Sequence, residues 1–284
     1  MDICLIAVPY HLGQEKQGMG LGPLKYLEAG IEQELITKVG KTSVEIVYIS
    51  ELEGNEKSRI VQVNQDLRRR VARARTKAQF PLILGGNCNT CFGTLAGLNT
   101  QDVGIVYLDA HGDFNTPETT LTGFFDGMPL AVATGQCHRD LWDQIADIDP
   151  IAESQTVHLG GRDFDPPEKK LLDNSHVMVV NTADIKDKGI ENALLPVLKK
   201  LQKRVSEIYL HIDIDVIDPT EVPGVDYRTP DGLSSDDVLQ IIQILNNRFS
   251  ISAAALTAYN PEKDIGETTV TVGKQLIHRL AKLK

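Results

Sequence analysis

Two short acidic motifs, far apart in the chain, carry residue types that bind metal ions. The first has the sequence DAHGD at positions 109–113, and the second has the sequence DID at positions 213–215. Each follows an apolar run, and alternate side chains of an extended strand point the same way, so the ligands of each motif should share a face. Carboxylates gathered in one place repel one another unless cations hold them together. A single DxD motif is typical of a solvated loop, but two such motifs behind apolar runs predict a dinuclear metal site.

The predicted ligands are four carboxylates and one imidazole: Asp109, His111, Asp113, Asp213 and Asp215. A ligand set dominated by oxygen suits a hard or borderline divalent ion such as Mn²⁺. The strands that precede the two motifs must therefore end close together in the folded chain.

Eight apolar, β-rich runs alternate with segments of helical periodicity along the chain. The runs are 3–8, 44–49, 80–84, 104–108, 156–159, 177–180, 208–212 and 252–256. The helical segments are 61–77, 128–146, 189–203, 234–248 and 268–284, and Ser234 supplies an N-cap. This alternation predicts an α/β fold with a mostly parallel sheet covered on both faces, in which ligands bind beyond the carboxyl ends of the strands.

Composition limits the class of protein. The 284 residues, 42% of them hydrophobic, suit a single domain spanning residues 1–284. A formal charge of −10 argues against nucleic acid and anionic membranes as partners, and no apolar run is long enough to span a bilayer. Four cysteines without a disulfide framework, and an N-terminus that favours a strand over a signal peptide, predict a cytoplasmic protein. The C-x-x-C spacing of Cys88 and Cys91 leaves a redox pair as a weaker alternative.

Further motifs extend the pattern around the two acidic segments. They are the Gly85-Gly86 turn, Asn115-Thr116 after DAHGD, GRDFDP at 161–166, DIDVIDP at 213–219 and Tyr259-Asn260-Pro261. In this order and with these flanks, the chain resembles the ureohydrolase superfamily, and most closely its arginases. The resemblance implies a three-layer α/β/α fold with an eight-stranded parallel sheet, two Mn²⁺ ions as cofactors, and a homotrimer or homohexamer.

The resemblance also implies roles for individual residues. Asp109 and Asp213 would bridge the two ions, with Asp113 on one ion and His111 and Asp215 on the other. Water activated by the ions would attack a guanidinium carbon, and Asp113 would pass a proton to the departing amine. The substrate is then a small guanidino amino acid, and the residues implied to bind it are Asn115, Thr120, Thr122, Asp165 and Glu168.

One predicted metal ligand and one predicted proton carrier depart from the family pattern. The histidine that family members carry after the third strand is Cys88 here, and a thiolate ligand would shift the preference from Mn²⁺ toward softer divalent ions. A histidine thought to relay protons in the family is Asp126 here. We expect Cys88 to be a metal ligand and Asp126 to be a catalytic proton carrier, although a carboxylate needs a raised pKa for that role at neutral pH.

A third departure affects the substrate. The glutamate that pairs with the substrate guanidinium, just before Tyr259, is Ala258 here. Losing a buried partner for a positive charge costs about 2–5 kcal/mol, so the sequence predicts a less basic guanidine, with Nω-hydroxy-L-arginine favoured and hydroxyurea and L-ornithine as products. Two alternatives are an ordinary arginase that forms urea, and a non-catalytic assembly or binding subunit that retains the fold.

Overall fold

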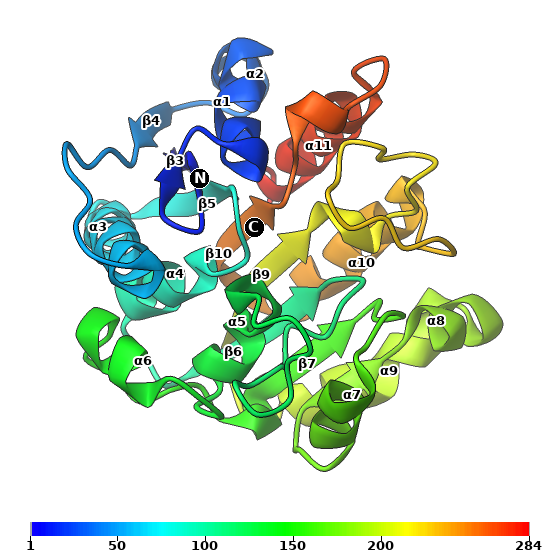
Figure 1. Ribbon diagram of the computed structural model, residues 1–284. Helices are drawn as coiled ribbons and strands as arrows, with labels where there is room; N and C mark the ends of the chain where they lie inside the picture. Colours follow the sequence, from blue (N-terminus) through cyan, green and yellow to red (C-terminus); the bar gives the residue numbers. More distant parts are fainter. Residues whose placement is uncertain (1, 284) are drawn as a thin grey trace.

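The computed structural model describes residues 2–283 and contains one large parallel sheet (Figure 1). Its strands are β1 (Asp2–Val8), β4 (Thr42–Ile46), β5 (Gln79–Gly85), β6 (Val103–Leu108), β7 (Thr156–Leu159), β8 (Met178–Val180), β9 (Glu207–Asp213) and β10 (Ser250–Thr257). They lie in the order β4-β1-β5-β10-β9-β6-β7-β8, and all seven neighbouring pairs are parallel. The eight predicted runs and the parallel sheet are therefore confirmed. The antiparallel pair β2 (Tyr10–His11) and β3 (Gln14–Glu15) lies outside this sheet.

Helices cover both faces of the sheet and complete three layers (Figure 1). They are α1 (Gly22–Glu28), α2 (Ile31–Lys38), α3 (Glu56–Thr76), α4 (Thr90–Leu98), α5 (Pro129–Ala133), α6 (Arg139–Ile145), α7 (Pro166–Asp173), α8 (Thr182–Lys188), α9 (Ile190–Leu201), α10 (Ser235–Asn246) and α11 (Thr268–Leu280). Short 3₁₀ turns include η2 (Phe125–Gly127) and η4 (Ile214–Val216). The helices α3 to α6 share one apolar core, whereas α1, α2, α9, α10 and α11 share the other. Within residues 2–283, no helix is long and apolar enough to cross a membrane.

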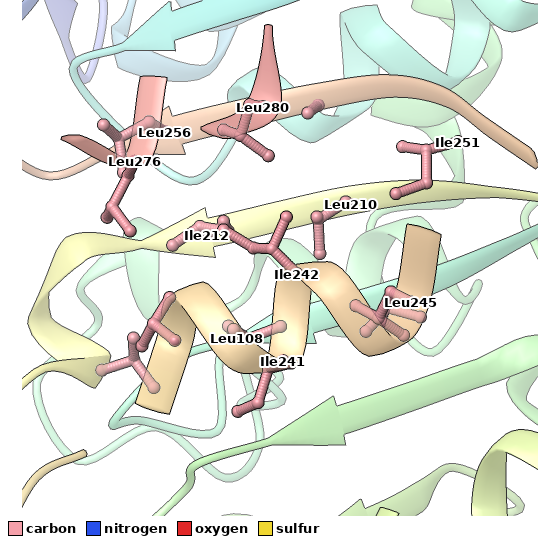
Figure 2. Close-up of a cluster of buried hydrophobic side chains, with 14 of the residues drawn as sticks. Leu108, Leu210, Ile212, Ile241, Ile242, Leu245, Ile251, Leu256, Leu276 and Leu280 are labelled. Atoms are coloured by element: carbon pink, nitrogen blue, oxygen red, sulfur yellow. The ribbon is translucent and has the colours of Figure 1, made fainter. Parts of the chain in front are cut away.

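The apolar core shared by α10 and α11 holds the central strands in place. Figure 2 shows aliphatic side chains of α10 and α11 meeting those of β9 and β10. Leu210 and Ile242 are fully buried there, and burying one such side chain contributes about 1.5–3 kcal/mol. The helix α10 begins as predicted at Ser234, whose hydroxyl accepts a hydrogen bond from the Asp237 amide at 3.1 Å in a capping box. The strand β9, which ends in the second acidic motif, is therefore anchored from this face.

Two expectations about local structure were wrong. The segment 128–146 forms two helices because Gly135 and His138, with φ of 82° and 50°, break the helical path between α5 and α6. The acidic motifs are also not extended, since β6 ends at Leu108 and Asp215 lies in the turn η4. Asp213, the last residue of β9, is placed by the strand, whereas the other ligands of the two motifs are placed by the turns that follow β6 and β9.

Candidate metal centre

The four central strands of the sheet end beside one another. Their order is β5-β10-β9-β6. Asp213 is the last residue of β9, and the segments that follow β5, β10 and β6 carry Cys88, Ala258 and Asp109 respectively. The carboxyl ends of parallel strands form the usual binding edge of such a fold. The segment that carries Cys88 also packs closely against β2, because a Cβ atom at Gly86 would lie 2.2 Å from the Tyr10 carbonyl oxygen. Four separate parts of the sequence therefore converge on one site.

Two groups of potential ligand atoms share one carboxylate. The ligand atoms of Cys88, Asp109 and Asp113 lie within 4.8 Å of one another, and so do those of Asp109, His111 and Asp215. The sixth predicted ligand, Asp213, places Oδ2 at 3.0 Å from the Cys88 sulfur. This arrangement suits two divalent ions with Asp109 between them. The structure thus brings all six predicted ligands together, while their binding of metal stays a prediction.

The electrostatics of the cluster also favour cations. Burial, and after it the Asp215 carboxylate, raises the pKa of Asp109 to about 7. Burial and neighbouring carboxylates likewise raise the pKa values of Asp113 and Asp213 well above their ordinary range. Burial lowers the pKa of His111, but Asp215 and Asp109 outweigh it and raise that pKa well above its ordinary value. Bound cations would stabilise the charged carboxylates that burial disfavours.

Buried aromatic and histidine side chains support the cluster from below. The Tyr107 hydroxyl donates to Asp113 Oδ2 at 2.6 Å, and the His211 ring stacks on the Tyr107 ring with centroids 4.2 Å apart. The Tyr209 hydroxyl lies 2.7 Å from His211 Nδ1, so His211 is a hydrogen-bonded core histidine. Sequence reasoning missed Tyr107, although it lies near the end of β6, only two residues before Asp109.

A cavity of about 480 Å³ opens above the predicted ligands. Its wall includes all five residues expected to bind substrate: Asn115, Thr120, Thr122, Asp165 and Glu168. It also includes Met19, Asp163, Asp226 and Tyr227, which sequence reasoning missed. The Tyr227 ring lies 5.5 Å from the Phe124 ring and 6.0 Å from the His111 ring, measured between centroids, so an aromatic pair borders the cavity. Asp163 lies in the GRDFDP motif, which could have indicated it, whereas Asp226 and Tyr227 lie in a loop and Met19 in a short 3₁₀ turn without a sequence pattern.

The predicted substrate-binding residues already make hydrogen bonds within the protein. Asn115 Nδ2 donates to Asp165 Oδ2 at 3.1 Å, which places two of them side by side. Glu168 accepts hydrogen bonds from the Phe114 amide at 2.8 Å and the Asp165 amide at 3.2 Å, one on each carboxylate oxygen. It also touches the acidic motif, because a Cβ atom at Gly112 would lie 2.5 Å from Glu168 Oε1. Glu168 therefore holds the first motif in place, and its contact with substrate stays a prediction.

The Asp126 carboxylate faces the turn that carries Cys88. It accepts hydrogen bonds from Asn87 Nδ2 at 2.5 Å, the Cys88 amide at 3.4 Å, and both the amide and Nδ2 of Asn89 at 3.2 Å. Burial raises the pKa of Asp126 to about 7, although these donors lower it. Its predicted role in proton transfer is untested by this geometry.

The cavity wall at position 258 is a methyl group. Ala258 is buried and adopts a left-handed φ of 66°, which is strained for a residue other than glycine. Near it, Asp226 Oδ1 accepts from Asn260 Nδ2 at 2.8 Å and pairs with Lys263 Nζ at 2.6 Å. Arg228 also borders the cavity, but its guanidinium donates to the Pro223 carbonyl oxygen. Asp226 is thus an acidic residue of the cavity wall whose carboxylate already has two partners, Asn260 and Lys263.

Comparison with known proteins identifies the chain. Residues 1–282 match the model of the arginase family. The chain belongs to the arginase family. It is 29% identical over 289 residues to an arginase of Staphylococcus aureus, with 97% of this chain and 95% of that protein covered, and 29% identical to an arginase of Bacillus caldovelox, with 98% and 97% covered. The crystal structure of an arginase from Bacillus cereus superposes with a TM-score of 0.89 at 29% identity, covering 100% of this chain and 99% of the other.

Membership of the arginase family makes this chain a metal-dependent ureohydrolase with the arginase fold. The three-layer fold with eight parallel strands, expected from the resemblance, is therefore confirmed. The family match and the six clustered ligand positions favour an enzyme over a non-catalytic subunit. The match with arginases supports hydrolysis of a guanidino group.

Proposed function

We propose that this arginase-family enzyme hydrolyses the guanidino C–N bond of an arginine-like amino acid and favours a less basic guanidine, such as that of Nω-hydroxy-L-arginine. The observation that carries this proposal is Ala258, whose methyl group lines the cavity at a position where the family places the partner of the guanidinium. A cation that lacks this partner binds about 2–5 kcal/mol more weakly. A hydroxylated guanidine can bind as a neutral group, so the absence of the glutamate costs it less binding free energy.

Six side chains are proposed to hold two divalent ions: Cys88, Asp109, His111, Asp113, Asp213 and Asp215. The chemistry that such ions supply is the acidification of water for attack on the guanidine carbon. The geometry places His111 Nδ1 toward Asp215 Oδ2 at 3.1 Å and leaves Nε2 toward the Thr229 hydroxyl. Mn²⁺ is expected at the oxygen-rich sites, and the Cys88 sulfur allows softer divalent ions beside it.

Asp113 is proposed to carry the proton to the departing amine. Its Oδ2 atom accepts from the Tyr107 hydroxyl at 2.6 Å, which fixes the carboxylate and leaves the other oxygen for the reaction.

The amino-acid end of the substrate is proposed to bind at the cavity wall formed by Asn115, Thr120, Thr122 and Asp165. The Asn115 amide and the Asp165 carboxylate already lie together, so a donor and an acceptor are available for a zwitterionic head group.

The protein is also proposed to form a homotrimer or homohexamer. Light scattering of the purified protein would test this oligomeric state.

Hydrolysis of ordinary arginine is the second candidate, favoured by two observations. The relatives reported above are named arginases. In addition, the Asp226 carboxylate lines the cavity and could face a guanidinium in place of the missing glutamate, although Lys263 already pairs with it.

The deciding experiment measures L-ornithine release from L-arginine and from Nω-hydroxy-L-arginine by the Mn²⁺-loaded protein. We expect a higher kcat/KM for the hydroxylated substrate. We also expect Ala258→Glu to raise kcat/KM for arginine about 30-fold, corresponding to roughly 2 kcal/mol, because it restores the partner of the cation. Ala258→Gln is the matched control, since it adds the same length without charge and should leave arginine hydrolysis low.

The opposite result would favour the second candidate. A wild-type enzyme that prefers arginine, and loses that preference in Asp226→Asn, would show that Asp226 replaces the missing glutamate. Activity on neither substrate, with two ions bound, would contradict both candidates.

A further inference from the structure

The turn that carries Cys88 is held by buried side chains on both sides. Asn87 Oδ1 accepts from the Leu12 amide at 2.7 Å, and Asn87 Nδ2 donates to Asp126 Oδ2 at 2.5 Å. On the other side of the cysteine, Asn89 Oδ1 accepts from Asn64 Nδ2 at 3.4 Å, and Asn89 donates twice to Asp126 Oδ1. All four side chains of this network are buried. The backbone that places the Cys88 sulfur is therefore fixed by a closed polar network.

Asp126 is the central acceptor of this network. A carboxylate has room for about four hydrogen bonds, and Asp126 receives four from residues 87–89. Replacing this carboxylate would leave several buried donors without a partner, and the turn would move to satisfy them. A side chain so fully engaged is poorly placed to receive a proton from substrate without releasing the turn.

The segment that contains Asp126 also holds the first acidic motif. Directly after η2, the amides of Leu130 and Ala131 donate to the Asp113 carbonyl oxygen at 2.9 and 3.1 Å. On the N-terminal side of Asp126, the chain continues into the loop that carries Thr120 and Thr122 on the cavity wall. One short segment thus connects the turn of Cys88, the backbone of Asp113 and the loop proposed to bind substrate.

We propose that Asp126 is a positioning residue that holds the 87–89 turn so that the Cys88 sulfur stays among the metal ligands. The inference rests on the proposed ligation of metal by Cys88, whose sulfur lies 3.0 Å from Asp213 Oδ2 and 3.3 Å from the Thr257 hydroxyl. Asn87 and Asp126 form one donor–acceptor pair, so exchanging the two side chains should preserve it. An aspartate introduced at position 87 could still accept from the Leu12 amide, and an asparagine introduced at position 126 could donate to that aspartate.

The test uses full-length protein loaded with Co²⁺, because a thiolate ligand gives a sulfur-to-cobalt charge-transfer absorption band. Wild type should bind two ions and show the band. Asp126→Asn should weaken the band and lower the affinity for one of the two ions about 10–100-fold, as expected when the partner of a ligand is removed. The double variant Asn87→Asp with Asp126→Asn should restore both. Glu118→Gln, an exposed acid in the same loop, is the matched control and should resemble wild type.

Three outcomes would overturn the proposal. Asp126→Asn that keeps the band and both affinities, but loses turnover with a shifted pH profile, would make Asp126 a proton carrier instead. A wild-type protein without the band would exclude Cys88 as a ligand, while its hydrolysis of guanidines could stand. Should Asp126→Asn fail to fold, Asn89→Ser removes one of the four donors to Asp126 together with the acceptor of Asn64 Nδ2, and an unchanged band and affinity in that variant would count against the proposal.

Discussion

The two halves of the candidate metal centre are built differently. In the half formed by Asp109, His111 and Asp215, the imidazole side chain is 27% exposed and its outer nitrogen has only a long contact of 3.5 Å to the Thr229 hydroxyl. In the half formed by Cys88, Asp109 and Asp113, every ligand is buried. The cysteine turn is held by Asp126, and Asp113 receives a hydrogen bond of 2.6 Å from Tyr107.

This difference suggests a division of tasks. Ligands of both halves line the cavity, but the exposed imidazole also lies against the ring of Tyr227, so this half can adapt when substrate enters. The enclosed half has fixed ligands, one of them a sulfur, so its geometry and its choice of metal are set by the buried network. Asp109 belongs to both ligand groups, so a change at Asp109 should affect metal binding in both halves.

The largest expected effect comes from the shared carboxylate. Asp109→Asn should reduce the bound metal from two ions toward none and lower hydrolysis at least about 100-fold, because both halves lose a charged ligand. Metal content after dialysis, measured by elemental analysis, checks this. Retention of one tightly bound ion would show that Asp109 serves one half only. Asp163→Asn, also on the cavity wall but outside both ligand groups, is the control and should retain two ions.

Removing support from the enclosed half should have the next largest effect. Tyr107→Phe keeps the ring that stacks on His211 and removes only the hydroxyl, so affinity for one ion should fall about 10–100-fold. The matched variant in the other half is Thr229→Val, which removes the long contact to His111 and should change affinity less than about 3-fold. Equal losses in the two variants, measured by metal titration, would contradict the comparison.

Changing the sulfur ligand should alter the choice of metal. Cys88→His introduces the harder imidazole, so the ratio of Co²⁺-supported to Mn²⁺-supported activity should fall about tenfold, equal to roughly 1.4 kcal/mol. Cys137→Ser changes a half-buried cysteine outside the ligand groups and should leave the ratio unchanged. An unchanged ratio in Cys88→His would indicate that the sulfur does not ligate.

The smallest expected effect is on thermal stability after chelation. Burial holds the pKa values of Asp109 and Asp126 at about 7, above their ordinary value, and raises those of Asp113 and Asp213 as well. The metal-free folded state therefore binds protons that the unfolded state releases between about pH 4 and 7, so its stability falls as pH rises through this range.

We accordingly expect the chelated protein to have a Tm a few degrees lower at about pH 8 than at about pH 5.5. Reloading with Mn²⁺ should raise the Tm more at the higher pH, because the carboxylates are then charged and the ions bind the folded state. Calorimetry at both pH values measures this. A chelated protein whose Tm rises between the two would contradict the assignment of the buried carboxylates.

Much of the fold and of the ligand set could be predicted from local sequence. Continuous apolar runs marked all eight strands of the sheet, and the caps and periodicity of α10 marked that helix, because burial and hydrogen bonding act there within a few residues. The segment 128–146 was misjudged because its apolar residues continue across the break at Gly135. The helix α4 was missed because it is buried along its whole length and so has no polar face to give a periodic signal.

The amino-acid sequence was enough to recognise the family, to predict the six metal ligands and to reveal the departures at Cys88, Asp126 and Ala258, since residue types and their spacing are local information. The folded chain was needed to show that Asp109 lies in both ligand groups, that Asp126 faces Asn87 and Asn89, and that Asp226 lines the cavity. These contacts depend on which strands pair and how the loops turn beyond them. Such pairings are set by the packing of distant segments, and no spacing along the chain records them.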